Sequence, residues 1–281
     1  MKKIISIFII LISLTGCGEY QRALNGDDVG KKYEAAVALY EEAQEKGRSN
    51  KGKYRKALRL LEQVVPQYRG KPQGEKLSFI YANTYFELGD FSLSGYEFDR
   101  FSTSYPRSER AEEAAYKSAK SYYYDSPRYT LDQTSTNQAI QKLQTYINRY
   151  PSGEYLDEAN ELAKELREKL EEKAFEIAKL YYNQGDLFIS GYSNYQAAVS
   201  AFDNFIVDYP GTPYREKAYY YKFDAQYKYA IGSYELLMAD RLKEAKEYFK
   251  TLKKYYPEGE LTADAEESMT DINERLQQLE K

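Results

Sequence analysis

A residue template that recurs before four prolines constrains the fold more than any other feature of the chain. Each of these prolines directly follows a tyrosine, and one small and two large residues lie 12, 8 and 5 positions before it. The copies are Ser94, Phe98, Phe101 and Pro106; Ala139, Leu143, Tyr146 and Pro151; Ala198, Phe202, Phe205 and Pro210; and Ala245, Phe249, Leu252 and Pro257. An earlier copy has Ala57, Leu61 and Val64, with Arg69 in place of the proline. This regularity indicates a chain built from repeats.

The spacing within the template is that of one helix face. Residues three and four positions apart lie on the same side of an α-helix, and no alternating, strand-like runs interrupt this rhythm after residue 31. The small residue lets two helices approach closely, and the proline ends the helix. This is the second half of the tetratricopeptide pattern, and Ala82, Ala119 and Ala178 mark first halves. The sequence therefore predicts an all-α fold, a tetratricopeptide-like solenoid of helical pairs with about five repeats.

Insertions and one long helix modify this plan. The prolines are 45, 59 and 47 residues apart, more than the ideal 34, and we expect polar loops at residues 47–51, 126–134 and 187–194. Residues 155–184 contain no proline or glycine, which predicts a single helix joining two groups of repeats; two helices broken near Glu171 are the alternative. We divide the chain into a signal peptide (1–16), a lipidated tether (17–30), N-terminal repeats (31–150) and a long helix with C-terminal repeats (151–281), forming one continuous solenoid.

The N-terminus is typical of an exported lipoprotein. Lys2 and Lys3 precede an apolar run at residues 4–14, which is too short to cross a bilayer and suits a signal peptide. The following Leu-Thr-Gly-Cys resembles a bacterial lipobox, where cleavage exposes Cys17 for lipid attachment. Cys17 is the only cysteine, and acylation accounts for a lone thiol in an exported chain; an ordinary signal peptide is the alternative. Gly18 after the cysteine, instead of Asp, favours sorting to the outer membrane.

The composition argues against catalysis. The chain has no histidine, no tryptophan and no second cysteine, which excludes Cys/His zinc sites and histidine-based acid–base catalysis. Phosphate-binding, dinucleotide and EF-hand motifs are absent from the sequence, and a net charge of −4 gives no general attraction for nucleic acid. We therefore expect no enzyme, no metal and no cofactor. An enzyme that uses carboxylates alone, such as a glycosidase, stays open, although no pair of carboxylates stands out.

The 32 tyrosines include candidates for binding other proteins. We expect most of them to pack between repeats and the remainder to line a peptide groove, because tyrosine combines an apolar ring with a hydroxyl that tolerates water. In tetratricopeptide arrays the first helix of each pair lines the concave face. Counting from Ala82 and Ala119, the predicted groove residues are Phe79, Asn83, Phe86, Tyr116, Lys120 and Tyr123. Asn83 and Lys120 are candidates to hold a peptide backbone or a carboxylate.

The lipobox, the length and the repeats together resemble the BamD family of the β-barrel assembly machinery. The clearest match lies at residues 139–186, where a Tyr150-Pro151-Ser152 turn is followed by a long helix that ends near Tyr181-Tyr182 and Gly185. The resemblance implies an outer-membrane lipoprotein that faces the periplasm of a Gram-negative bacterium. Its N-terminal repeats would receive unfolded outer-membrane β-barrel proteins, and its C-terminal repeats would dock on the POTRA repeats of a BamA-like barrel subunit.

The sequence departs from that family at residues 125–136 and in its tyrosine-rich C-terminal repeats, so no individual interface residue is transferred. Two alternatives remain. One is a periplasmic coordinator of envelope or peptidoglycan machinery, which shares such repeats but is usually soluble and often carries an N-terminal coiled coil that this sequence lacks. The other is a solute-capture helical lipoprotein, which is generally much larger.

Overall fold

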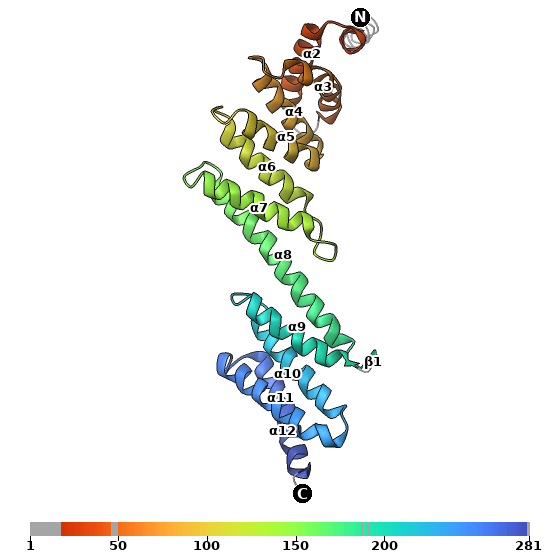
Figure 1. Ribbon diagram of the computed structural model, residues 1–281, viewed down its shortest axis with the longest axis vertical. Coiled ribbons are helices and arrows are strands. Elements are labelled where there is room, and N and C mark those ends of the chain that lie inside the picture. Colours follow the sequence, from red (N-terminus) through yellow and green to blue (C-terminus); the bar gives the residue numbers. More distant parts are fainter. Residues whose placement is uncertain (1–17, 46–49, 187, 190–191, 280–281) are drawn as a thin grey trace, which may run out of the picture. The chain divides into compact units, whose positions relative to one another are not determined.

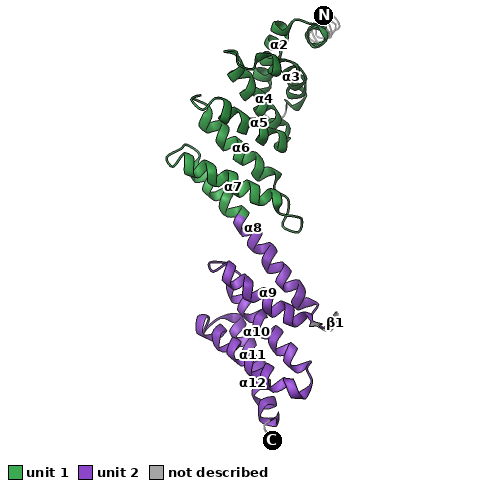
Figure 2. Cartoon of the chain, in the orientation of Figure 1, with its two compact units in different colours: residues 1–166 green, residues 167–281 purple. Residues whose placement is uncertain are grey.

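The computed structural model describes residues 18–45, 50–186, 188–189 and 192–279. Cys17, the lipobox and the apolar run before it lie outside the described residues. The chain divides into two compact units, residues 1–166 and 167–281 (Figure 2). Both units are built from helices that pack in sequential pairs, which confirms the predicted all-α, tetratricopeptide-like fold (Figure 1).

The described part of unit 1 contains three helix pairs. After a helical stretch at residues 18–25, α2 (Val29–Glu45) packs on α3 (Lys51–Val64), which continues into a short 3₁₀ turn, η2 (Val65–Tyr68). The second pair is α4 (Gly74–Leu88) with α5 (Phe91–Ser104), and the third is α6 (Ala111–Asp125) with α7 (Thr134–Arg149). The start of α8 (Leu156–Asn183) completes the core of this unit through Ala159, Ala163 and Leu166.

Unit 2 begins within α8 and contains the remaining repeats. Phe175 and Ala178 of α8 share a core with α9 (Asn194–Asp208) and α10 (Arg215–Ile231). The last elements are α11 (Glu235–Tyr255) and α12 (Glu260–Leu279). Two short strands, β1 (Phe188–Ile189) and β2 (Tyr192–Ser193), pair antiparallel before α9. The insertion expected at residues 187–194 therefore contains a short hairpin, which the sequence did not indicate because two-residue strands are too short to show a periodic pattern.

The proline template marks the helix ends and the core as predicted. In each copy the tyrosine before the proline donates its backbone N–H to the carbonyl four residues earlier, as Tyr105 does to Phe101 at 2.8 Å. The proline cannot extend this ladder, so α5, α7, α9 and α11 end there. The small and large template residues are buried in every copy except for Phe249, which is half-buried. The repeat register inferred from the sequence is thus confirmed.

The long helix is also confirmed. The 28 residues of α8 form one uninterrupted α-helix, about 42 Å long at 1.5 Å per residue, and the alternative break near Glu171 is wrong. The boundary between the two units falls inside this helix, after Leu166. Of the other expected insertions, residues 126–133 connect α6 to α7, while residues 46–49 lie outside the described part of the chain.

Candidate protein-binding site

The three predicted groove residues on α4 are buried. The Phe79 ring makes edge-to-face contacts with Phe98 and Phe101 of α5, with ring centroids 5.5 and 5.4 Å apart. Phe86 meets Phe91 in the same way at 5.7 Å. These contacts hold α4 against α5, so both phenylalanines serve the packing of their own pair. Asn83 is only 1% exposed and takes part in a polar network instead.

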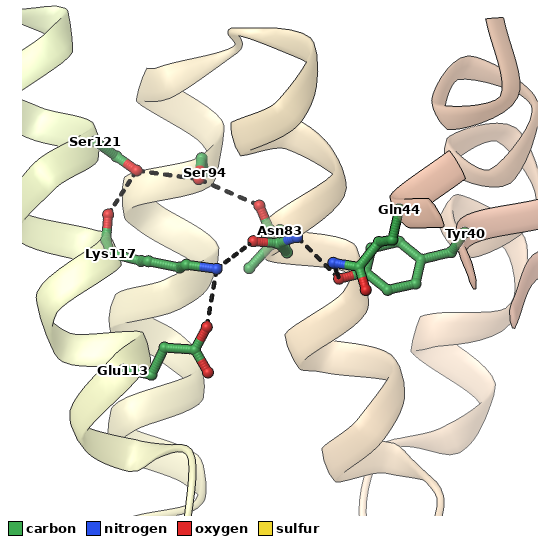
Figure 3. Close-up of polar contacts among 8 residues, drawn as sticks. Tyr40, Gln44, Asn83, Ser94, Glu113, Lys117 and Ser121 are labelled. Carbon is green, nitrogen blue, oxygen red and sulfur yellow. Dashed lines mark hydrogen bonds and ion pairs between the residues drawn. The ribbon is translucent and has the colours of Figure 1, made fainter. Parts of the chain in front are cut away.

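Asn83 connects the first helices of three successive pairs (Figure 3). Its amide nitrogen donates to the hydroxyl of Tyr40 on α2 at 2.8 Å, and its amide oxygen accepts from the ammonium of Lys117 on α6 at 2.8 Å. The Tyr40 hydroxyl also accepts from Gln44 at 2.8 Å, and burial raises the pKa of Tyr40. Both sides of the Asn83 amide therefore have partners within the fold.

Lys117 is the centre of this network and was not singled out in the sequence. Its ammonium pairs with Glu113 at 2.9 Å and lies 5.6 Å from the centroid of the Phe79 ring. Beside it, the Ser121 hydroxyl lies 3.1 Å from that of Ser94, and both are buried. The spacing of four residues between Glu113 and Lys117 predicts an ion pair on one face of a helix. Nothing in the sequence indicates that the lysine also faces Asn83.

The three predicted residues on α6 contact α8 or Tyr155, which directly precedes it. Tyr116 is buried and stacks flat on the ring of Tyr155, with the centroids 4.4 Å apart. Lys120 pairs with Glu158 at 2.6 Å, and this hydrogen bond holds the pKa of the Glu158 carboxyl below its usual value. The Tyr123 hydroxyl donates to Glu165. That bond, with partial burial, raises the pKa of Tyr123 to about 12.

The six predicted groove residues therefore differ in accessibility. Phe79, Asn83, Phe86 and Tyr116 lie within the packing of unit 1, whereas Lys120 and Tyr123 are partly exposed. A bound segment could reach only the last two directly. The role of the six residues in peptide binding stays a prediction.

A tyrosine hydrogen bond recurs between successive first helices. The Tyr123 hydroxyl bonds to Glu165, that of Tyr182 to Asp224, and that of Tyr227 to Asp271. Together with Tyr40 and Asn83, these pairs are 42 to 44 residues apart in the sequence. We call these four pairs the tyrosine joints. They support the expectation that the tyrosines mainly pack between repeats with their hydroxyls near polar groups.

Unit 2 exposes an apolar turn that sequence reasoning missed. Tyr234 is 85% exposed and Leu236 is 90% exposed where α10 passes into α11, and Leu237 beside them is also exposed. Such contiguous exposed apolar side chains are typical of a surface that another protein covers. The only signal in the sequence is the Tyr-Glu-Leu-Leu run directly after Gly232-Ser233, which the helical periodicity does not explain.

Within the described residues, no group of three or more His, Cys, Asp or Glu side chains could hold a metal ion. None of the helices of this part of the chain is both long and apolar enough to cross a membrane.

Comparison with known proteins gives one family. The model of the family YfiO, described as an outer membrane lipoprotein, matches residues 33–190 and 184–281. No curated protein matches. Two solved structures of a Podosopora anserina putative kinesin light chain with TPR-like repeats are similar at 12% and 14% identity, over 84% and 78% of this chain and 96% and 93% of theirs. Their TM-scores are 0.31 and 0.32, so the fold assignment rests on the helix pairing above.

Proposed function

Because the chain belongs to the YfiO (BamD) family of outer membrane lipoproteins, we propose that it is a scaffold of the β-barrel assembly machinery. In this role it assists the insertion and folding of outer-membrane β-barrel proteins. The observation that carries the proposal is the family match, which runs through both structural units. The chain acts by binding other proteins, not by catalysis.

The proposal includes a lipid anchor at Cys17. The protein is held by acyl chains on this residue in the outer membrane and faces the periplasm. The lipobox and the absence of any other cysteine support this assignment. More than one acyl chain is needed for stable attachment.

The two units serve different partners. In unit 1, Lys120 and Tyr123 are the accessible members of the predicted groove set, and extended segments of unfolded β-barrel proteins contact them. The buried members, Phe79, Asn83, Phe86 and Tyr116, shape the surface from beneath. In unit 2, the exposed turn at Tyr234, Leu236 and Leu237 docks on the POTRA repeats of a BamA-like barrel subunit, because covering this apolar surface is favourable.

A pull-down with the barrel subunit tests the second contact. Leu236→Ser should weaken capture of the POTRA region, because this side chain is 90% exposed and contributes little to the fold. Val207→Ser is the matched control, since Val207 is an apolar residue of α9 that is 73% exposed. Equal capture by both variants would refute the docking surface.

Depletion of the protein in its own organism tests the role as a whole. Folded barrels in the outer membrane should decrease before lipoprotein sorting or wall synthesis changes. Normal barrel assembly after full depletion would contradict the proposal and would favour a coordinator of the cell envelope.

A further inference from the structure

The exposed side of α3 carries a concentration of positive charge. This helix of 14 residues contains five Lys or Arg residues and a single acidic residue, Glu62. Its apolar side is buried in the core of unit 1. The exposed basic side chains are Lys51, Arg55, Lys56 and Arg59, which we call the α3 basic face. Lys51, Arg55 and Arg59 form one stripe at intervals of four residues, and Lys56 lies beside it.

These four charges are not neutralised by the described residues. The fifth basic residue of α3, Lys53, pairs with Glu42 of α2, and Lys31 and Lys76 also have carboxylate partners. The α3 basic face, by contrast, has no ion pair with any residue in the described ranges. In a chain with a net charge of −4, a face of four unpaired cations points to an anionic partner.

The α3 basic face adjoins the end of the chain that would carry the lipid. Tyr20 is buried among α2 and α3, and the ammonium of Lys56 lies 5.3 Å from the centroid of its ring. Tyr20 lies three positions after Cys17, with only Gly18 and Glu19 between them, and even a fully extended chain of three residues would span no more than about 10 Å. This reach is comparable to the Debye length of about 8 Å at physiological salt. An acyl anchor on Cys17 therefore keeps this corner of unit 1 within electrostatic range of the membrane surface.

We propose that the α3 basic face docks on anionic phospholipid headgroups of the membrane that holds the anchor. The inference rests on the proposed lipidation of Cys17. The partner is a membrane because the face adjoins the anchor, while no comparable geometry favours a nucleic acid or an acidic protein. Each Lys or Arg close to an anionic membrane raises the affinity about fivefold, which corresponds to about 1 kcal/mol. Docking of this face would set the orientation of the first repeats at the membrane surface.

Vesicle binding by the unacylated mature chain tests the proposal. The protein is the mature chain carrying Cys17→Ser, and the vesicles contain phosphatidylethanolamine with phosphatidylglycerol, or phosphatidylcholine alone as the neutral reference. The test variant is Lys51→Gln/Arg55→Gln/Arg59→Gln, which leaves Lys56 in contact with Tyr20. The control variant, Arg107→Gln/Lys217→Gln/Lys243→Gln, removes the same charge from exposed positions elsewhere in the chain. Thermal melting of all three proteins checks that they are equally folded.

The parent chain should bind the anionic vesicles, and this binding should weaken at higher salt. It should not bind the neutral vesicles. The test variant should bind at least about tenfold more weakly, because three contributions of about fivefold are lost, whereas the control should stay within about twofold. No binding of the parent chain to anionic vesicles, or equal loss in both variants, would overturn the inference. Because the assay uses unacylated protein, its failure is distinct from absence of lipid on Cys17, which would instead refute the proposed anchor.

Discussion

The substitution Asn83→Ala tests most directly whether the polar network around this residue stabilises the fold. The buried amide makes one neutral hydrogen bond to Tyr40 and one charge-assisted bond to Lys117. A neutral bond contributes about 1 kcal/mol and a bond to a charged group about 1.5–3 kcal/mol. Lys117 keeps Glu113, and the Tyr40 hydroxyl keeps Gln44, so neither is left without a partner. We therefore expect a loss of about 2–4 kcal/mol in the free energy of unfolding.

Two companion variants sharpen this measurement. Asn83→Asp should lose much less, because a carboxylate can accept hydrogen bonds from both Lys117 and the Tyr40 hydroxyl. Tyr40→Phe removes one of the bonds, so the double variant Tyr40→Phe/Asn83→Ala should be less destabilised than the sum of the two single variants, by about 1 kcal/mol.

Urea unfolding followed by circular dichroism measures these free energies. A loss below about 0.5 kcal/mol for Asn83→Ala is within the range of ordinary surface substitutions and would refute the structural role of the amide. If Asn83→Ala instead captures unfolded β-barrel segments more weakly without a change in stability, Asn83 is part of the binding groove predicted from the sequence. Lys120→Ala and Tyr123→Phe are the reference variants, since these residues are accessible and should affect binding more than folding.

Three other predictions follow from the sequence and the structure. Ala198→Leu should lower stability by about 1–3 kcal/mol, because Ala198 is completely buried between helices; an unchanged melting temperature would contradict the repeat register. Cys17→Ser should abolish metabolic labelling with fatty acid, and an unlabelled parent protein would exclude the anchor. Burial raises the pKa of Tyr40 and Tyr85 above the usual value, so the stability they contribute is complete below about pH 10 and is lost as the pH rises. Urea midpoints measured from about pH 9 upward should therefore fall as tyrosinate absorbance appears, and a flat profile would disprove this linkage.

The repeat register was readable from the sequence because each part of the template has one physical meaning. The template combines a buried small residue such as Ala198, two large residues on the same helix face and a proline that ends the helix. Only a pair of packed helices accounts for all of these features. The uninterrupted α8 was equally legible from its lack of proline and glycine.

The environment of the groove candidates was not readable in the same way. Position within the repeat placed Asn83 and Lys120 at equivalent points of their helices, yet Asn83 is enclosed by Tyr40 and Lys117 while Lys120 stays partly exposed. The difference arises from residues about 34 to 43 positions away in the sequence, which periodicity within one helix cannot reveal. The exposed turn at Leu236 was missed because an apolar residue of a predicted helix is ordinarily assigned to the core even where the periodicity does not place it there.

The tyrosine joints make the repeats of this chain individual. Tyr40 meets an asparagine, Tyr123 a glutamate, and Tyr182 and Tyr227 aspartates, so each of these four junctions pairs a tyrosine hydroxyl with a polar side chain of a particular length. Arrays of identical consensus units can be lengthened or shortened by whole modules. If one repeat of this chain were removed or duplicated, a tyrosine would face the partner residue of a different junction. A polar group would then be poorly paired. The side chains at the junctions thus determine the order and the number of repeats.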